Sequence, residues 1–364
     1  MFRSEPPRIM HHALRITHHA SQIMERPNLT HTPPDVLAYI EYLEMQLLQK
    51  PAKVEPVAAA TEPSEPPTSI NIISISQSGV AKRTPRHFYS RQHRAGMGVF
   101  DLDTPEEDPP AFLVAADITD RLLLFTNFGR VFPTSVSQVK ETEVRGKGES
   151  ILTGLRLMNN ERLVAVLPGT GGEDVLLASQ RGWVRAIRKS FLGTQLIPGM
   201  SFHEPKEGGE LRAACWSNGG DVLIATRQGK GVRFNQRQIP GRNGCLGARV
   251  DQGDEVVAVA SVTEESGVFM VGHDGKGTIR QMSGLMANKA PGAGAKVLIK
   301  VEELVGAAAV NPNQDIFIIS KLGKLIRFPA EEIPAKEGVV QGVHCMTLRA
   351  DVAAACTVSE FVSG

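Results

Sequence analysis

From residue 69 onward the chain repeats one pattern: an apolar run, a polar turn with glycine, then a second run that carries a basic residue. The turn glycines lie 50, 53, 47, 46 and 48 residues apart and are Gly79, Gly129, Gly182, Gly229, Gly275 and Gly323. This period suits one four-stranded propeller blade per repeat. The six repeats therefore predict an all-β, propeller-like ring of six blades.

Two further marks follow the same period. A second glycine comes 17 to 19 residues after each turn, at Gly98, Gly148, Gly199, Gly247, Gly294 and Gly342. An aspartate opens an apolar strand in four repeats, at Asp120, Asp174, Asp221 and Asp315. In a ring, neighbouring blades cover both faces of each sheet, so strands of this kind can be apolar on both faces. The second glycine predicts a close backbone approach at that point.

Composition agrees with short strands and sets a limit on binding. The chain has 35 glycines and 23 prolines but only 5% aromatic residues, a balance typical of many strands and turns. The formal net charge is +1, and residues 70–364 hold 34 basic against 31 acidic residues. Any nucleic-acid surface must therefore arise from local clustering of charge, and we expect moderate, salt-sensitive affinity.

The first 68 residues differ from the repeats in composition and in hydrophobic pattern. Residues 1–50 include Asp35, a helix cap, followed by an apolar stripe at Val36, Ile40, Leu43 and Leu47, which predicts a short helical segment. Residues 51–68 are rich in Pro, Ala and Glu and predict a flexible linker. The ring is expected to span 69–364.

Several site classes find little support in the sequence. The four cysteines form no Cys-x-x-Cys pair and predict reduced, mostly buried thiols. The histidine pairs at 11–12 and 18–19 lack further ligands at a suitable spacing, so we expect no metal and no cofactor. With no signal peptide and no apolar run of about 18 residues, the sequence predicts a cytoplasmic, nucleoid-associated protein without a membrane contact.

The first repeats also carry a family resemblance. The run SGVAKRTPRHFYSRQHRAGMGV, with TPEED and LLLFTNFGRVF after it, resembles the C-terminal domain of DNA gyrase A or of its topoisomerase IV counterpart, over about residues 70–358. The resemblance implies a six-bladed β-pinwheel that wraps duplex DNA around a basic rim. The family's box, Gln-Arg-Arg-Gly-Gly-Lys-Gly, corresponds to residues 92–98 here, with His93, Ala95 and Met97 at three of its positions.

Repeated basic residues and the box supply the candidate DNA contacts, because Lys and Arg neutralise phosphates and release counterions. The candidates are Lys82, Arg83, Arg86, Arg91, Gln92, His93, Arg94, Gly96, Gly98, Arg130, Arg145, Lys147, Arg185, Arg188, Lys230, Arg233, Lys276, Arg280, Lys324 and Arg327. The alternative interpretation is that these side chains are simply solvated and deter strand aggregation.

Catalysis is not expected. The tyrosines Tyr39, Tyr42 and Tyr89 lack the preceding Arg and the acidic cluster that the resemblance associates with strand cleavage. Two hypotheses remain: a non-catalytic protein that binds and bends double-stranded DNA, with gyrase or topoisomerase IV subunits as partners in trans, or a propeller that serves as a protein-interaction platform.

Overall fold

The structure is a computed structural model that describes residues 33, 36, 40 and 65–360. The chain divides into two compact units, Met1–Ala60 and Thr61–Gly364. Val36 and Ile40 are helical. The rest of the expected N-terminal helix, and the linker as far as residue 64, lie outside the described residues.

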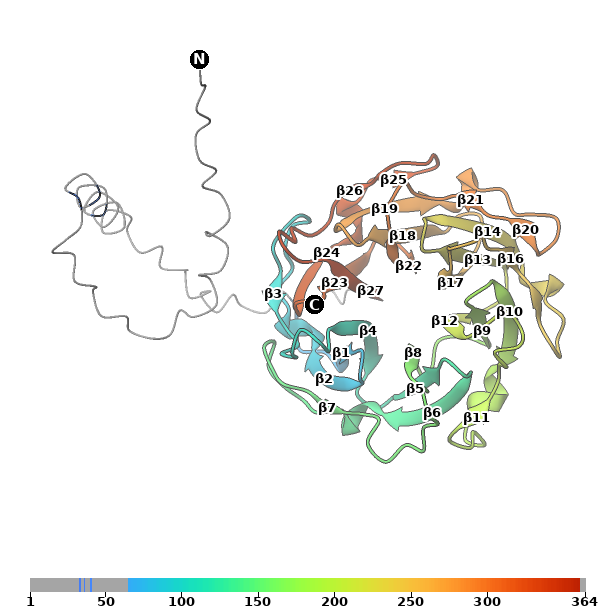
Figure 1. Cartoon of the computed structure of the whole chain (residues 1–364), viewed down its shortest axis with the longest axis horizontal. Coiled ribbons are helices and arrows are strands. Elements are labelled where there is room, and N and C mark those ends of the chain that lie inside the picture. The colour runs from blue at the N-terminus through green and yellow to red at the C-terminus, as the bar shows by residue number, and fades with distance from the viewer. Residues whose placement is uncertain (1–32, 34–35, 37–39, 41–64, 361–364) are drawn as a thin grey trace, which may run out of the picture. The chain divides into compact units, whose positions relative to one another are not determined.

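The second unit is a ring of six antiparallel blades around a central axis (Figure 1), which confirms the predicted all-β, six-bladed fold. The innermost strands of neighbouring blades contact one another around the whole ring. They are β4 (Pro110–Asp117), β8 (Leu163–Pro168), β12 (Leu211–Ser217), β17 (Val256–Val262), β22 (Leu304–Val310) and β27 (Ala353–Glu360).

A hairpin forms the middle of each blade, with the repeat's turn glycine at its tip. Its first strands are β1 (Ile70–Ser76), β5 (Arg121–Thr126), β9 (Asp174–Ser179), β13 (Asp221–Thr226), β18 (Gly267–Gly272) and β23 (Gln314–Ser320). Its second strands are β2 (Val80–Pro85), β6 (Arg130–Ser135), β10 (Trp183–Arg188), β14 (Lys230–Asn235), β19 (Lys276–Gln281) and β24 (Lys324–Pro329). All six turn glycines have positive φ, between 71° and 89°, which glycine adopts without the strain of a Cβ.

The fourth strand of every blade is donated by the following blade. We call these six strands the outer belt: β3 (Val99–Phe100), β7 (Glu149–Ser150), β11 (Met200–Ser201), β15 (Cys245–Leu246), β21 (Lys296–Val297) and β26 (Val343–His344). In each pairing the residue after the turn glycine lies opposite the second residue of the donated strand. Because β3 of the first blade pairs with β24 of the last, the exchange closes the ring.

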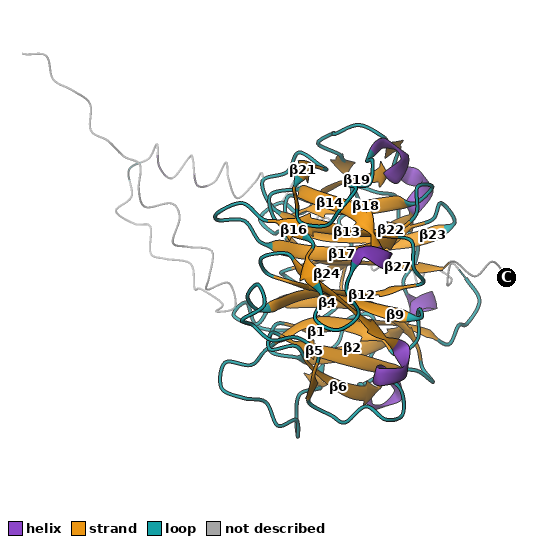
Figure 2. Ribbon diagram, turned by 90° about the vertical axis from the view of Figure 1, so that its right-hand side faces the viewer, coloured by secondary structure: helices purple, strands orange, loops and turns teal. Residues whose placement is uncertain are grey.

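Short elements fill the crossings between blades. A 3-10 helix follows each hairpin: η1 (Arg86–Phe88), η2 (Val136–Gln138), η3 (Lys189–Leu192), η4 (Gln236–Gln238), η5 (Met282–Gly284) and η6 (Ala330–Glu332). These helices lie toward one face of the ring (Figure 2). Parallel pairings join β16 (Ala248–Arg249) to β20 (Ala293–Gly294) and β25 (Ala335–Lys336) to β19.

The hydrophobic core is divided among the six seams between blades. One cluster, for example, joins Ile73 and Val114 of blade 1 to Leu124 and Phe132 of blade 2, and five equivalent clusters lie in the other seams. Each sheet therefore buries apolar side chains on both faces, which accounts for hairpin strands without polar alternation.

Candidate nucleic-acid interface

Close backbone contacts hold the outer belt against the hairpins. A Cβ at Gly98 would lie 2.6 Å from the carbonyl oxygen of Leu325, and one at Gly342 would lie 2.4 Å from that of Gly277. The predicted close approach is therefore found. In blade 4 the donated strand follows Gly244 and not Gly247. In blade 5 it follows Ala295 instead of Gly294, so the sequence alignment of these two glycines is wrong.

The box at 92–98 crosses the outer edge of the last blade. The backbone N–H of Gln92 donates to the Arg327 carbonyl oxygen at 2.8 Å, and that of Ala95 donates to the Cys345 carbonyl oxygen at 2.8 Å. His93 is exposed and lies 3.1 Å from Glu332. The box is thus a seam between the first and last blades, and its two glycines, at 96 and 98, act through backbone packing.

A cation and aromatic cluster lies directly beyond the box. Phe100 of β3 is 53% exposed. The Arg145 guanidinium lies 5.6 Å and the Lys324 ammonium 5.2 Å from the centre of its ring, within the range of cation–π attraction. The three side chains come from blades 1, 2 and 6, so the belt brings distant basic residues together at the seam.

Five of the candidate basic residues are buried and hold the ring together. They are Lys82, Arg86, Arg233, Arg280 and Arg327, all at most 5% exposed. In this structure they do not face solvent, so a phosphate outside the ring cannot reach them. Carboxylates and carbonyl oxygens accept from four of them inside the seams, whereas Arg280 donates to Gly284 O and leaves its Nε and Nη1 without a hydrogen-bond partner among the described residues.

Lys82 lies on the face of the blade 1 hairpin that it shares with Ile72, where the crossing segment of blade 2 passes the hairpin's outer edge. Its ammonium lies 2.5 Å from Asp101 and donates to Thr84 at 3.1 Å and to the carbonyl oxygen of Glu143 at 2.9 Å. Burial lowers the pKa of Lys82 and raises that of Asp101, while the attraction between the two groups opposes both shifts. The pair fixes residues 143–144 immediately before Arg145.

Arginines four residues after a turn glycine bind the 3-10 helix of the next blade. Arg233 Nη1 donates to the carbonyl oxygens of Met282 and Leu285 at 2.6 and 2.9 Å. Arg327 does the same for those of Arg86 and Tyr89 at 3.2 and 2.9 Å. Arg83 Nε donates to Val139 O at 3.0 Å. The guanidinium groups thus add donors to carbonyl groups at the start or end of a short helix, of which Met282 O and Arg86 O also accept from the N–H of Leu285 and Tyr89.

The ring closes over a buried ionic cluster at the seam between blades 6 and 1. Glu65 accepts from Arg86 at 2.9 Å and from Arg327 at 2.7 Å. Arg327 and Arg91 both pair with Asp315, at 2.6 and 2.8 Å. Glu65, which falls in the range predicted as linker, is thus buried within the ring. No sequence pattern indicated the two partners of Glu65.

The other charged candidates face solvent to different degrees. Arg130, Lys230 and Lys276 are half-buried and paired with Glu161, Asp251 and Asp274 at 2.6, 2.6 and 3.1 Å. The exposed candidates are His93, Arg94, Arg145, Lys147 and Arg188. Half-buried side chains with part of their surface in solvent are Arg83, Arg91, Gln92, Arg185 and Lys324.

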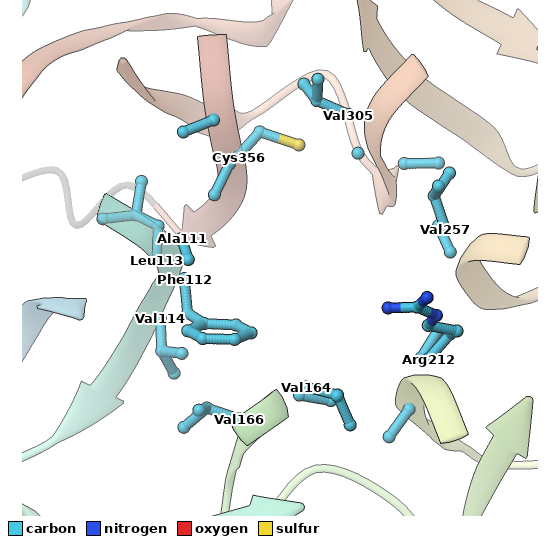
Figure 3. A pocket seen from close by; sticks show the side chains of 18 of the residues that line it. Ala111, Phe112, Leu113, Val114, Val164, Val166, Arg212, Val257, Val305 and Cys356 are labelled. Carbon is cyan, nitrogen blue, oxygen red and sulfur yellow. The ribbon is translucent and has the colours of Figure 1, made fainter. Parts of the chain in front are cut away.

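The inner strands also surround a hollow at the centre of the ring. A cavity of about 170 Å³ is lined by the inner strands, with Phe112, Val164, Val257 and Val305 around it (Figure 3). Arg212 is the one charged side chain among the described residues that line it, and it pairs with Glu255 at 2.8 Å. The side chains that line it are apolar except for Arg212, whose charge Glu255 neutralises, so the cavity offers a ligand no unpaired charge among the described residues.

Three observations bear on other site classes. The four cysteines are free, and burial raises the pKa of the Cys215, Cys345 and Cys356 thiols to about 12. Over residues 65–360 and the three described N-terminal positions, no three His, Cys, Asp or Glu side chains cluster as metal ligands would. The described helices include none that is long and apolar enough to cross a membrane.

The closed ring with exchanged outer strands defines a six-bladed β-propeller of the pinwheel type. The chain belongs to the family described as "DNA gyrase C-terminal domain, beta-propeller", whose model matches residues 71–118, 120–169, 220–263 and 314–353. These stretches fall in blades 1, 2, 4 and 6, whereas most of blades 3 and 5 lies outside them.

Curated relatives and solved structures agree with this family. The chain is 29% identical over 291 residues to DNA gyrase A of Staphylococcus epidermidis, covering 76% of this chain and 33% of the relative. It is 30% identical over 295 residues to that of Chlamydia pneumoniae, covering 76% and 35%. The chain thus spans about a third of the relatives' length. The solved DNA gyrase A C-terminal domain shares the fold with a TM-score of 0.68 at 20% identity, covering 80% of this chain and all of that one. That of topoisomerase IV gives 0.56 at 15%, covering 80% and 93%.

Proposed function

We propose that this protein binds duplex DNA along the outer edge of the ring and bends or wraps it, without catalysis of its own. The observation that carries the proposal is the basic cluster around Phe100. Arg145 and Lys324 are drawn together there from different blades, and Arg94 and Lys147 are exposed on the same crossing segments. Family membership supports this interpretation, because the related proteins are subunits of DNA gyrase.

The buried basic residues support the proposal indirectly. Lys82 fixes the segment that leads into Arg145, and Arg327 accepts the box on its carbonyl oxygen. The DNA contacts are therefore proposed for the exposed and half-buried candidates, while the buried ones position them. Gyrase or topoisomerase IV subunits in trans are the proposed protein partners.

The test is equilibrium binding to a short and a long duplex over a range of salt concentrations. Neutralising several phosphates gives a logarithmic salt slope of about −0.9 per phosphate. We expect the long duplex to bind more tightly and with the steeper slope, because it can follow the ring past several blades. Equal affinity and equal slope for the two lengths would contradict bending around the edge.

A variant pair makes the test specific. Arg145→Ala with Lys147→Ala removes two exposed charges next to Phe100 and should lower the slope by about two units. Lys206→Ala is the control. Lys206 is exposed, lies in another blade and pairs with the neighbouring Glu204, so its loss should change the salt slope little. Identical slopes for both variants would remove the Phe100 cluster from the interface.

The alternative function, a protein-interaction platform, has one observation in its favour. Met97, Val99 and Phe100 are 51%, 41% and 53% exposed on one short segment, and such apolar groups on a surface favour protein contacts. If neither duplex binds near physiological salt, this segment is the surface on which to seek a protein partner.

A further inference from the structure

Blade 3 has a pocket on its outer side that includes two of the candidate DNA contacts, Arg185 and Arg188, and lies apart from the Phe100 cluster. It measures about 270 Å³ and is lined by Arg185, Ala186, Ile187, Arg188, Phe191, Phe202, Gly241 and Arg242. Three arginines and two phenylalanines around one hollow of this size form an unusual lining for a structural gap. Phe191 is 59% exposed, so one wall is an open aromatic ring.

The crossing segment of blade 4, which passes the outer edge of the blade 3 hairpin, is short. Ten residues separate η2 from β7 and η6 from β26, but only six separate η4 from β15 and seven separate η3 from β11. The longer crossings cover the outer edge of the preceding hairpin. The Arg83 N–H, for example, donates to Lys140 O at 2.9 Å, and Asn288 N–H donates to Arg233 O at 2.6 Å.

Ala186 occupies the same register position as those two arginines, four residues after its turn glycine. Among the described residues, the crossing segment of blade 4 makes no backbone hydrogen bond to Ala186. Alanine also leaves empty the volume that Arg83, Arg233 and Arg327 fill in their own blades. The short crossing and the small side chain together open the pocket, and residues 170–219 lie outside the stretches that match the family.

The arginines of the pocket have no ion-pair partner among the described residues, although Lys206 and, to a lesser degree, the charge of Arg185 lower the pKa of the nearby Glu204. In the described part of the chain, Arg185, Arg188 and Arg242 form no ion pair, and no carboxylate lines the pocket. Arg185 Nη1 donates to Phe202 O at 2.8 Å, while its Nε is buried without a hydrogen-bond partner. Asp174, which lies opposite Arg188 in the hairpin, accepts from Gln236 at 2.8 Å.

We propose that this pocket binds a phosphate group, held by the guanidinium groups of Arg185, Arg188 and Arg242, with Phe191 against the adjoining sugar or base. Guanidinium forks match the geometry of phosphate oxygens, and the exposed side chains of Arg188 and Arg242 can reach a ligand in the pocket. The phosphate can belong to a DNA backbone, in which case the inference rests on the proposed function, or to a free nucleotide.

The test compares Arg188→Ala/Arg242→Ala with Arg156→Ala, an exposed arginine of blade 2, in the whole 364-residue chain. Both altered side chains are exposed, so we expect unchanged far-UV circular dichroism and urea midpoint. One arm measures duplex affinity against salt. The other titrates dAMP, inorganic phosphate and unphosphorylated deoxyadenosine by calorimetry.

If the phosphate belongs to DNA, the double variant lowers the salt slope by about one unit and the affinity about five-fold at ~0.15 M salt, beyond any effect of Arg156→Ala. If it belongs to a free nucleotide, dAMP binds saturably to the native protein, deoxyadenosine does not, and the double variant loses the binding. The second result supports the pocket even where the native protein fails to bind duplex and the proposed function is wrong. A double variant that matches Arg156→Ala in both arms overturns the pocket inference, whether or not duplex binds.

Discussion

Arg327 of the last blade and Glu65, which precedes the first, form a 2.7 Å ion pair in which both side chains are fully buried. The two residues are 262 positions apart in the sequence. Arg86 shares the same carboxylate, at 2.9 Å. The ring is thus closed by a charge cluster as well as by the exchange of β3.

Glu65→Gln should destabilise the ring by about 3–5 kcal/mol, because the buried guanidinium of Arg86 loses its counter-charge and that of Arg327 keeps only Asp315. Urea unfolding measures the effect. Glu141→Gln is the matched control, since Glu141 pairs with Arg83 but is 53% exposed, and an exposed pair contributes about 0–1 kcal/mol. Equal effects of the two variants would show that the closing cluster is not an important source of stability.

Lys82→Met should separate stability from DNA binding at a residue that the sequence assigned to DNA contact. It leaves Asp101 buried without its cation, so we expect a loss of about 3–5 kcal/mol in unfolding free energy. Lys82→Met/Asp101→Asn should recover much of that loss, because no isolated charge remains. The salt slope of the folded single variant should equal that of the native protein, and a slope lower by about one would instead place Lys82 at a phosphate.

Gly98→Ala tests the close approach of the outer belt to the hairpin. Gly98 has φ +70°, and the added Cβ would lie 2.6 Å from Leu325 O, so both strain and a clash are expected. Gly154→Ala separates the backbone strain from the clash, since Gly154 has φ +82° but nothing lies within 4 Å of its Cβ position. We expect about 1 kcal/mol for Gly154→Ala and a further 1–3 kcal/mol for Gly98→Ala. Similar unfolding free energies for both variants would argue against the clash.

His203 should make stability sensitive to acid. Its ring is buried, its Nε2–H donates to Gly209 O at 2.8 Å, and burial lowers its pKa below the ordinary 6.5. As the pH falls below about 6.5, the unfolded chain binds a proton that the folded chain resists, so stability decreases by at most about 1.4 kcal/mol per pH unit. The stability of His203→Gln, measured by urea unfolding from pH 7.5 to 5, should fall less steeply than that of the native protein. His93→Gln, which alters an exposed ring, should keep the native slope.

The sequence predicted the ring because its geometry recurs along the chain. Each turn glycine marks a hairpin tip, and the regular period counts the blades. In blades 4 and 5 the second glycine does not directly precede the donated strand, as it does in the other blades. In blade 4 the reason is local. A crossing four residues shorter than that of blade 2 moves the donated strand to follow Gly244, and Gly247 instead lies against Val184 and Ile224.

The basic residues were harder to sort, because an arginine on a strand has the same sequence pattern whether it faces solvent or a seam. One signal was present. Arg83, Arg233 and Arg327 each follow an Asn or Asp by 12 residues, namely Asn71, Asp221 and Asp315. That spacing joins the two ends of one hairpin and indicates a structural pair. Glu65 had no such signal, since its partners come from two different blades.

The donated strands also impose an order on synthesis. Among the strands that the structure describes, β3 pairs with β24 alone, and β24 is translated about 220 residues later. At ~5–20 residues per second, the Val99–Phe100 edge and the last hairpin cannot meet for roughly 10–45 s. During that interval the nascent chain displays an apolar strand without its neighbour, and the sheet of the last blade is then completed by a strand that was synthesised with the first.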